Sequence, residues 1–338
     1  MACFKLKYKP ARTFTVAEDG FYGKYYEPET IRFPGKAMVV CSGSDGSFLL
    51  TQLGAEKFCE AGMPVIAMAY WNAPGTPQDV ELSPVEYLQR ACRWLRGRGY
   101  HPGAWGISLG GLYVLLCASL FPEIECVVAA SPIHALFQCG SFTHGLHFAG
   151  NSPFSYEGKP LPYVKAADPD RMLKQAKRNL LFKREPDMLY YYDILKEPHD
   201  PAADVKVENI QAPVLLISGG EDVMVPADWV CEEVIRRLDA HGFAYPHKHL
   251  NYPVLSHYAC PIRPVSSFIF KVERKRKADC NRNREQSWQD TLQFLREDWI
   301  PVKELSEVEN NAFDHFSGNR ALRGDHADAV LRGGFYSG

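Results

Sequence analysis

The chain has 338 residues, of which 46% are hydrophobic and 23% are charged, and its formal net charge is −2. A charge this close to zero excludes a broadly basic nucleic-acid-binding surface, and no apolar stretch is long enough to cross a bilayer. We therefore expect neither a nucleic-acid partner nor insertion into a membrane.

The first ten residues carry charges but lack the apolar segment of a secretory signal, so we expect no such signal. Ten cysteines are scattered along the chain without a C-x-x-C pair, and some, such as Cys117 and Cys126, stand within apolar runs. This usage is typical of buried free thiols in a reducing compartment rather than of disulfides or a metal site. The sequence therefore predicts a cytoplasmic protein without a metal or another cofactor.

Aromatic residues alternate along the first 35 residues, between the turn signals Asp19-Gly20 and Pro34-Gly35, which predicts a leading antiparallel hairpin. Strands and helices then alternate. We expect strands at 37–41 and 64–70, a helix at 47–61 and a second helix that ends near 97. Residues 83–86 match a capping box with proline at the first helical position, so the second helix should begin there.

The next stretch has the pattern G-x-S-x-G at 106–110, followed by a further glycine. A short apolar strand at 104–107 precedes it, and an apolar helix at 109–121 follows it. In a nucleophile elbow, this sharp strand-to-helix turn presents a serine, and glycines avoid clashes with the neighbouring strand and helix. The context favours Ser108 as a nucleophile over the alternative of a tight turn with an incidental serine.

The rest of the chain repeats the alternation around one long interruption. We expect strands at 126–130, 213–218 and 247–252, and helices at 226–240 and 285–299. Residues 131–209 are rich in Pro, Gly, Tyr, Phe and His and are predicted to be an inserted cap or lid. The fold class is therefore α/β, as one domain over 1–300 with a mostly parallel sheet and helices on both faces, followed by a polar tail at 301–338.

Two loops after later strands can supply the groups that a serine nucleophile needs. Asp222 follows a glycine turn after the strand at 213–218, with Glu221 as a fallback for the acid. His257 lies just past the last predicted strand and is the predicted base. The simpler alternatives are a turn or helix-capping role for Asp222 and a surface position for His257.

The oxyanion hole should use the backbone N–H of Leu109, the residue after the proposed nucleophile. A second N–H should come from the loop at 41–47, where Asp45 or Gly46 is the expected donor. The alternative is an ordinary turn between a strand and a helix.

Three other features of the sequence are weaker evidence for a binding site. His247 and His249 alternate on a strand, and His134, His144 and His147 fall in the predicted cap, where we favour pocket lining over a metal site. The basic run at 271–277 could attract the phosphates of a carrier molecule, but a solvated basic loop is the simpler interpretation.

Five stretches resemble a known family over about residues 15–300, and the segment at 152–163 is the most specific of them. They are 42–46, 67–70, 106–111, 152–163 and 207–219. The chain resembles the C-terminal catalytic domain shared by acyl-CoA thioesterases of the α/β-hydrolase type and bile acid-CoA:amino acid N-acyltransferases. The resemblance implies an α/β-hydrolase fold, with Ser108 as nucleophile, Asp222 as acid and His257 as base.

Two features differ from the pattern of that family. Animal members carry an additional N-terminal β-sandwich domain, for which we expect no room in this chain. Members that transfer the acyl group to an amino acid have cysteine at the nucleophile, where this chain has Ser108. The serine favours water as the acyl acceptor.

We therefore expect a serine acyl hydrolase whose substrate is a small acyl thioester, resembling acyl-CoA, or an ester. A carboxylesterase or dienelactone-hydrolase-like enzyme without CoA, an acyl-CoA:amino acid N-acyltransferase and a non-catalytic binding protein on the same fold are the alternatives.

Overall fold

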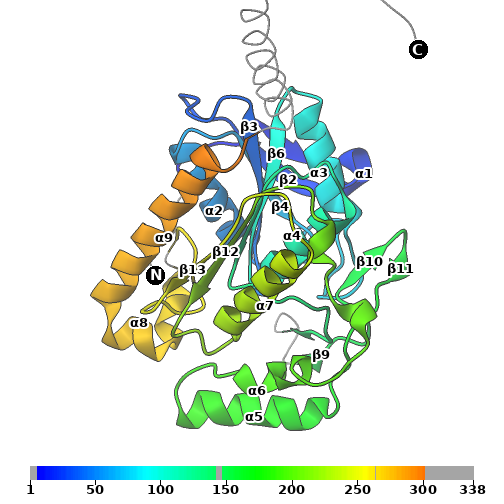
Figure 1. The fold of residues 1–338 in the computed structure, drawn as a ribbon, viewed down its shortest axis with the longest axis vertical. Helices are drawn as coiled ribbons and strands as arrows, with labels where there is room; N and C mark the ends of the chain where they lie inside the picture. Colours follow the sequence, from blue (N-terminus) through cyan, green and yellow to red (C-terminus); the bar gives the residue numbers. More distant parts are fainter. Residues whose placement is uncertain (1–5, 142–146, 263, 301–338) are drawn as a thin grey trace, which may run out of the picture. The chain divides into compact units, whose positions relative to one another are not determined.

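An eight-stranded sheet runs through the centre of the computed structural model, which describes residues 6–141, 147–262 and 264–300 (Figure 1). The strand order is β1-β2-β4-β3-β6-β7-β12-β13. The pairs β1–β2 and β2–β4 are antiparallel, and every later pair in this sheet is parallel. The predicted polar tail at 301–338 lies outside the described residues.

The predicted N-terminal hairpin is confirmed. It joins β1 (Arg12–Phe14) to β2 (Tyr22–Tyr26), with Thr13 opposite Lys24. Between them lies the one-turn helix α1 (Val16–Asp19), whose N-terminus is capped by the Thr15 hydroxyl. The aromatic alternation of the sequence buries Phe14 and Tyr25 in the core.

The predicted parallel strands are also confirmed, although the strand before Ser108 begins earlier than expected, at His101. These strands are β3 (Lys36–Cys41), β4 (Val65–Ala69), β6 (His101–Ile107), β7 (Val127–Ala130), β12 (Val214–Gly219) and β13 (His247–Tyr252). All but the edge strand β13 are buried along nearly their whole length, because helices cover both faces of the sheet. Their carboxyl ends lie at one edge, which is where ligands bind in such sheets.

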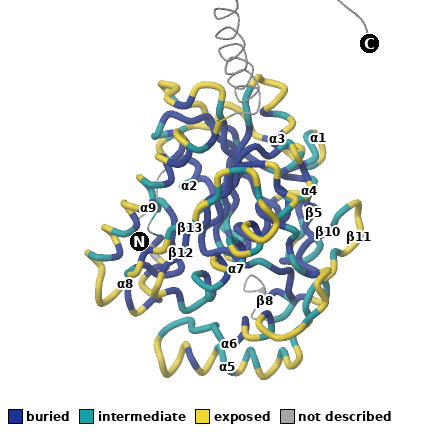
Figure 2. The backbone as a smooth tube through the Cα atoms, viewed as in Figure 1, coloured by how far each residue is buried: buried dark blue, intermediate teal, exposed yellow. Residues whose placement is uncertain are grey.

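Helices pack on both faces of the sheet, as predicted. One face carries α3 (Glu86–Arg96), α4 (Leu109–Leu120) and α7 (Ala227–Ala240), and the other carries α2 (Phe48–Glu60) and α9 (Lys277–Glu297). Successive residues of a strand point to opposite faces of the sheet. Val39 therefore packs in the hydrophobic core on the first face and Val40 in the core on the second. Figure 2 shows the buried backbone concentrated in the sheet and its adjoining helices.

The predicted capping box at 83–86 is wrong. Ser83–Pro84 form the short strand β5, which pairs with β10 (Phe154–Tyr156), and α3 begins only at Glu86. The Ser83 N–H donates to the Pro153 carbonyl at 2.9 Å, and the Glu86 carboxylate accepts the Glu157 N–H at 2.6 Å. The Ser83 N–H and the Glu86 carboxylate, which would bond each other in a capping box, therefore bond the segment around β10 instead.

The residues between β7 and β12, here called the insertion (131–209), contain short strands and helices. They are β8 (Gly140–Ser141), β9 (His147–Phe148), β10 (Phe154–Tyr156), β11 (Lys159–Pro160), α5 (Pro169–Phe182), α6 (Leu189–Tyr192), and the 3-10 turns η1 (Asp193–Leu195), η2 (Pro201–Ala203) and η3 (Val207–Asn209). In Figure 1, α5 and α6 lie beyond one end of the sheet, with α5 on the outer side.

The basic run at 271–277 is helical except at Arg276, so the expected basic loop is wrong. It forms α8 (Lys271–Lys275) and the start of α9, which begins earlier than the predicted residue 285; the 3-10 turn η4 (Val265–Ile269) precedes it. The reason is tertiary: Glu273 of α8 and Arg284 of α9 form a buried ion pair. Arg284 Nε also donates to the Tyr258 carbonyl at 3.4 Å.

Nine cysteines lie within the described residues, and all nine are buried and unbridged. Burial raises the pKa of their thiols, for example to about 11 for Cys260. The helices of the described part are all too short or too polar to cross a membrane.

We predict that Arg284→Met lowers the free energy of unfolding by about 3–5 kcal/mol, because it removes one partner of the buried Glu273–Arg284 ion pair and keeps the other buried. The double variant Arg284→Met/Glu273→Leu should lose less, since it removes both charges of that pair. Arg236→Met, which removes the exposed pair with Glu233, should cost less than about 1 kcal/mol. Urea unfolding of the four proteins measures this, and equal losses for the Arg284 and Arg236 variants would contradict it.

Candidate active site

Ser108 lies on a sharp turn between β6 and α4, with φ 58° and ψ −123°. A positive φ is strained for a non-glycine residue, and such strain is concentrated at functional sites. Glycines make the turn possible: a Cβ on Gly106 would stand 2.1 Å from the Gly110 carbonyl oxygen, and one on Gly110 would stand 2.3 Å from the Ser42 carbonyl oxygen. The strand-turn-helix expected from the sequence is present, and the nucleophilic role of Ser108 stays a prediction.

Asp222 and His257 form a buried pair at the neighbouring strand ends. His257 Nδ1 lies 2.8 Å from Asp222 Oδ2, and the two side chains are 6% and 2% exposed. Because Nδ1 faces a carboxylate, it carries a proton, which leaves Nε2 of a neutral ring as the acceptor. Asp222 Oδ1 also accepts the N–H groups of Met224 and Val225 at 2.9 and 3.0 Å. Asp222 therefore caps this turn, as the alternative interpretation expected, and bonds His257 at the same time. The fallback acid Glu221 is exposed.

The loop that carries His257 is held from two sides by groups that sequence reasoning missed. The Ser131 hydroxyl, just past β7, donates to the His257 carbonyl oxygen at 3.1 Å. The Ser256 hydroxyl donates at 2.9 Å to Glu273 Oε1, the carboxylate of the buried pair with Arg284. Ser131 and Glu273 are remote from His257 in the sequence, and Ser256 is adjacent to it but carries no motif, so no local signal could have identified these contacts.

The loop after β3 is fixed beside Ser108 by the residues that follow β4. The side chains of residues 70–72 donate to the carbonyls of Ser42, Gly43 and Gly46 at 3.0, 3.4 and 3.0 Å, respectively. Gly43 lies so close that an added Cβ would be 3.1 Å from Ser108 Cβ. The loop therefore has a defined position next to the proposed nucleophile.

This geometry adds two candidate N–H donors to those predicted for the oxyanion hole. Leu109 opens α4, so its N–H is at a helix N-terminus, as expected. Ser44 lines the same pocket as Ser108, and Gly43 lies against Ser108. Asp45 and Gly46, the donors expected from the sequence, follow directly, and the Asp45 carboxylate accepts the Ser47 N–H at 2.8 Å. Gly43 and Ser44 join them as candidate donors.

A largely apolar pocket opens beside Ser108. It encloses about 630 Å³ of empty space, part of it continuous with solvent. Most of its walls come from the insertion, with α5 and α6 both contributing. The lining residues are Ser44, Ser108, Leu109, Ile133, Phe137, Cys139, Gly140, Phe148, Met172, Leu173, Met188, Tyr191, Tyr192 and Met224. Such walls suit an apolar group, with Ser108 as a polar atom at one end.

The remaining histidines that the sequence singled out are paired elsewhere. His247 Nε2 lies 2.8 Å from Asp239 Oδ1, and His249 Nε2 lies 2.7 Å from the Ser218 hydroxyl. Other partners are Asp79 for His147 and the Trp229 ring for His134, while His144 lies outside the described residues. Within the described ranges, the structure contains no group of three or more His, Cys, Asp or Glu side chains that could hold a metal ion.

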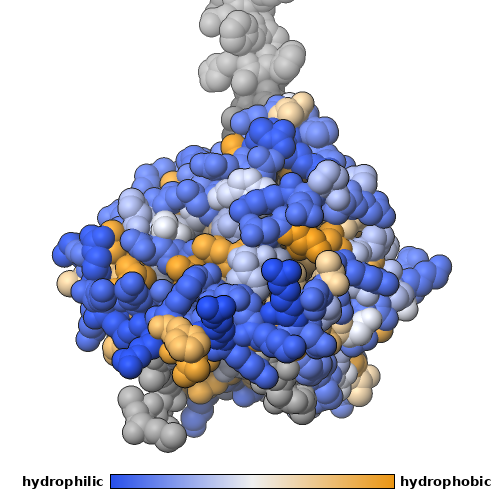
Figure 3. Space-filling model, turned by 90° about the horizontal axis from the view of Figure 1, so that it is seen from below, coloured by the Kyte–Doolittle hydropathy of each residue, from blue (hydrophilic) through white to orange (hydrophobic). Residues whose placement is uncertain are grey.

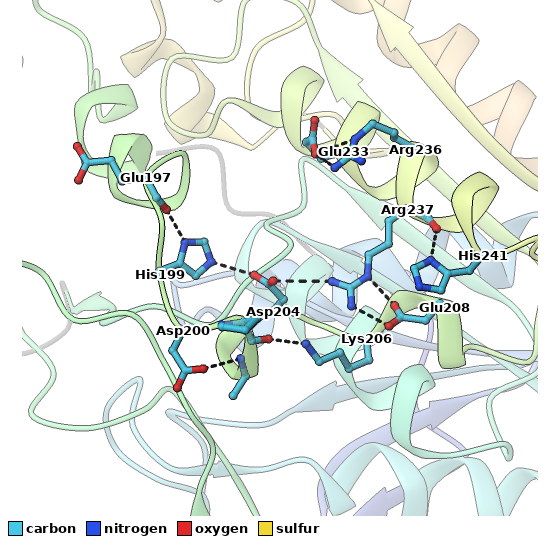
Figure 4. Close-up of polar contacts among 12 residues, drawn as sticks. Glu197, His199, Asp200, Asp204, Lys206, Glu208, Glu233, Arg236, Arg237 and His241 are labelled. Atoms are coloured by element: carbon cyan, nitrogen blue, oxygen red, sulfur yellow. Dashed lines mark hydrogen bonds and ion pairs between the residues drawn. The ribbon is translucent and has the colours of Figure 1, made fainter.

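A polar cluster anchors the end of the insertion to α7 (Figure 4). Arg237 Nε of α7 lies 2.7 Å from Glu208 Oε2, and its Nη1 lies 3.8 Å from Asp204 Oδ2. His199 stands between Asp204 Oδ1 and the Glu197 carbonyl, at 2.9 Å from each. Both partners are acceptors, so both ring nitrogens donate when the ring is charged. Burial by itself lowers the pKa of His199, but these hydrogen bonds outweigh it and raise the pKa above its usual 6.5.

Comparison with known proteins connects the chain to one family. A family model described as "BAAT / Acyl-CoA thioester hydrolase C terminal" matches residues 83–300. Acyl-coenzyme A thioesterase 1 of Homo sapiens is 27% identical over 244 residues, which cover 70% of this chain and 51% of that protein. Mitochondrial acyl-coenzyme A thioesterase 2 of Mus musculus is 26% identical over 245 residues, covering 70% and 47%. The chain thus spans about half the length of these relatives.

Solved structures share the α/β-hydrolase fold at low sequence identity. A mutant of the esterase rPPE superposes with a TM-score of 0.52 at 14% identity, covering 88% of this chain and 86% of that one. The acylaminoacyl peptidase of Pyrococcus horikoshii gives 0.51 at 14% identity, covering 88% and 42%. The predicted fold class is confirmed.

We predict that Gly110→Ala lowers the free energy of unfolding by about 1–3 kcal/mol, because the new methyl group would overlap the Ser42 carbonyl. Gly97→Ala is the matched control, since its Cβ meets only ordinary contacts at 3.5 Å. Thermal unfolding compares the two, and an unchanged melting temperature for Gly110→Ala would be inconsistent with the close packing of the turn.

The His199 contacts predict that the stability of this end of the insertion depends on pH. A raised folded-state pKa means that the stabilisation is fully present below pH 6.5 and is lost as the pH rises through the folded value. NMR titration of the ring should give a pKa above 6.5, and Asp204→Asn should lower it. A ring that titrates at or below 6.5 in the unmodified protein would contradict the prediction.

Proposed function

Because the chain belongs to the BAAT / acyl-CoA thioester hydrolase C-terminal family, we propose that it is a serine hydrolase of acyl thioesters that works through an acyl-enzyme. The observation that carries the proposal is that the buried Asp222–His257 pair and the strained Ser108 turn both follow the carboxyl ends of parallel strands in one sheet. The names of the relatives support an acyl-CoA-like substrate. Nine buried free thiols support a reducing compartment such as the cytoplasm.

In the proposed mechanism, His257 Nε2 accepts the Ser108 proton as the hydroxyl attacks the thioester carbonyl. The negative charge on the tetrahedral oxygen is stabilised by backbone N–H groups, from Leu109 and from the loop at 43–46. Collapse of this intermediate expels the thiolate, which takes the proton from His257. The acyl group is then bound to Ser108 as an ester.

Deacylation repeats the same steps with water as the nucleophile. His257 accepts a proton from water, and the second tetrahedral intermediate releases the carboxylic acid and restores the Ser108 hydroxyl. Asp222 holds the Nδ1–H tautomer and stabilises the imidazolium that forms in each half-reaction. The two backbone N–H bonds to its other oxygen keep the carboxylate oriented.

The insertion is proposed to act as the cap that receives the acyl chain. Its residues Phe137, Met172 and Tyr191 face the pocket that also contains Ser108. Burying an apolar chain there would stabilise the complex by about 0.8 kcal/mol per methylene. Longer chains should therefore bind more tightly until the pocket is filled.

We predict that Ser108→Ala lowers kcat for an acyl-CoA by about 10⁴-fold or more while the melting temperature stays close to that of the unmodified protein. Ser119→Ala, on the same helix, is the matched control, because its hydroxyl donates to the Leu116 carbonyl at 2.7 Å, within the helix itself. Release of free thiol measures the rate.

Three further readouts distinguish the alternatives. An intact-mass measurement during turnover should find the acyl group on the unmodified protein and not on Ser108→Ala. Faster turnover of a short p-nitrophenyl ester than of any acyl-CoA would replace the thioesterase proposal by a carboxylesterase. Amide formed with added glycine or taurine would indicate acyl transfer, and near-normal hydrolysis by Ser108→Ala would refute the mechanism.

A further inference from the structure

The C-terminal end of α5 exposes three consecutive large apolar side chains. Leu180, Leu181 and Phe182 are 56%, 70% and 75% exposed. Phe268 and Ile269 of η4 are also exposed. We call these five residues the apolar patch. Contiguous apolar surface of this kind marks an interaction site rather than an ordinary surface.

Hydrogen bonds join the two segments of the apolar patch. Arg274 Nη2 donates to the Arg184 carbonyl at 2.8 Å, and its Nη1 donates to the Phe268 and Ile269 carbonyls at 2.7 and 2.8 Å. The Lys271 N–H donates to Glu185 Oε1 at 2.8 Å. The residues that follow α5 are therefore tied to η4 and α8, which brings the two groups of exposed apolar side chains to the same part of the molecule.

The two segments that carry the apolar patch are also rich in positive charge. Residues 169–184 contain six basic side chains and one acidic side chain. Arg171, Lys174, Lys177 and Arg178 are exposed, and no carboxylate among the described residues pairs with any of them. The basic run that begins at Lys271 adds further cations beside η4. The basic residues at 271–277, for which the sequence left phosphate binding open, thus follow exposed apolar side chains of η4.

The position of α5 makes this surface accessible. The helix lies on the outer side of the insertion, away from the sheet (Figure 1). Seen from that end, the surface is mostly hydrophilic and is interrupted by several hydrophobic areas (Figure 3). The inner side of the same helix contributes Met172 and Leu173 to the Ser108 pocket. A helix that exposes cations and apolar side chains on the outside of the molecule suits a binding partner with a flat surface better than one with a groove.

We propose that α5 and η4 dock the protein on an anionic lipid bilayer. The leucines and Phe182 would enter the boundary between headgroups and acyl chains, and the lysines and arginines would meet the lipid phosphates. A second copy of the chain fits less well, because a two-fold contact would place two basic surfaces against each other. Docking concerns the outer face of α5, so it does not depend on the proposed hydrolysis.

The test is cosedimentation of the full chain with vesicles of phosphatidylcholine alone or mixed with phosphatidylserine. We expect binding to the anionic vesicles, weaker binding to the neutral ones, and loss of binding as salt is raised. Leu181→Ser/Phe182→Ser and Lys177→Glu/Arg178→Glu should each lower the partition coefficient at least about tenfold. The Ser108→Ala variant should bind like the unmodified protein, which separates this result from that of the activity assay.

Matched controls change the same chemistry elsewhere. Ile31→Ser removes an apolar side chain that is 52% exposed outside the patch, and Lys9→Glu/Lys159→Glu reverses two exposed charges. Both controls should bind normally. Equal binding to neutral vesicles, no binding to anionic vesicles by folded protein, or equal losses in the controls and the patch variants would each overturn the proposal. Capture of an acidic protein without vesicle binding would do the same.

Discussion

The contact of the Ser108 turn with the neighbouring backbone is the constraint on which the site depends. The chain leaves β6 and enters α4 through a residue at positive φ, with Gly110 against the Ser42 carbonyl. No side chain fits between these backbones, so strand, turn and the loop after β3 are packed as one unit. Ser108 and the loop at 43–46 are consequently adjacent before any substrate is present, which is the preorganisation that stabilisation of an oxyanion requires.

The second half of the site depends on contacts between distant segments. His257 lies on a loop, and loops of this kind need support from the scaffold to hold a side chain in one geometry. Ser131 fixes its carbonyl, Asp222 fixes its ring, and Ser256 connects the loop to the buried Glu273. Each hydrogen bond joins this loop to a different segment of the chain. The helices α8 and α9, remote from the chemistry, thereby support the orientation of the proposed base.

The insertion has two faces with different chemistry. Its inner side forms an apolar pocket around Ser108, while its outer side combines cations with exposed leucines and a phenylalanine. The same helix, α5, takes part in both, since Met172 faces inward and Leu181 is exposed. At the other end of the insertion, Arg237 of α7 pairs with Glu208, and His199 pairs with Asp204 inside the insertion. The insertion is thus anchored to the scaffold by charge and presents its apolar groups to ligands.

The sequence by itself determined the sheet, its helices and the order of Ser108, Asp222 and His257, because apolar periodicity and glycine turns act over a few residues. The predictions for 83–86 and 271–277 were wrong, because contacts with distant residues outweigh the local pattern there. Ser83 pairs with β10, and Glu273 forms an ion pair with Arg284. Neither partner is within reach of a local motif. Only the tertiary structure decided the pocket walls, the tethers of His257 and the exposure of Leu181, since each depends on which distant segments meet when the chain packs.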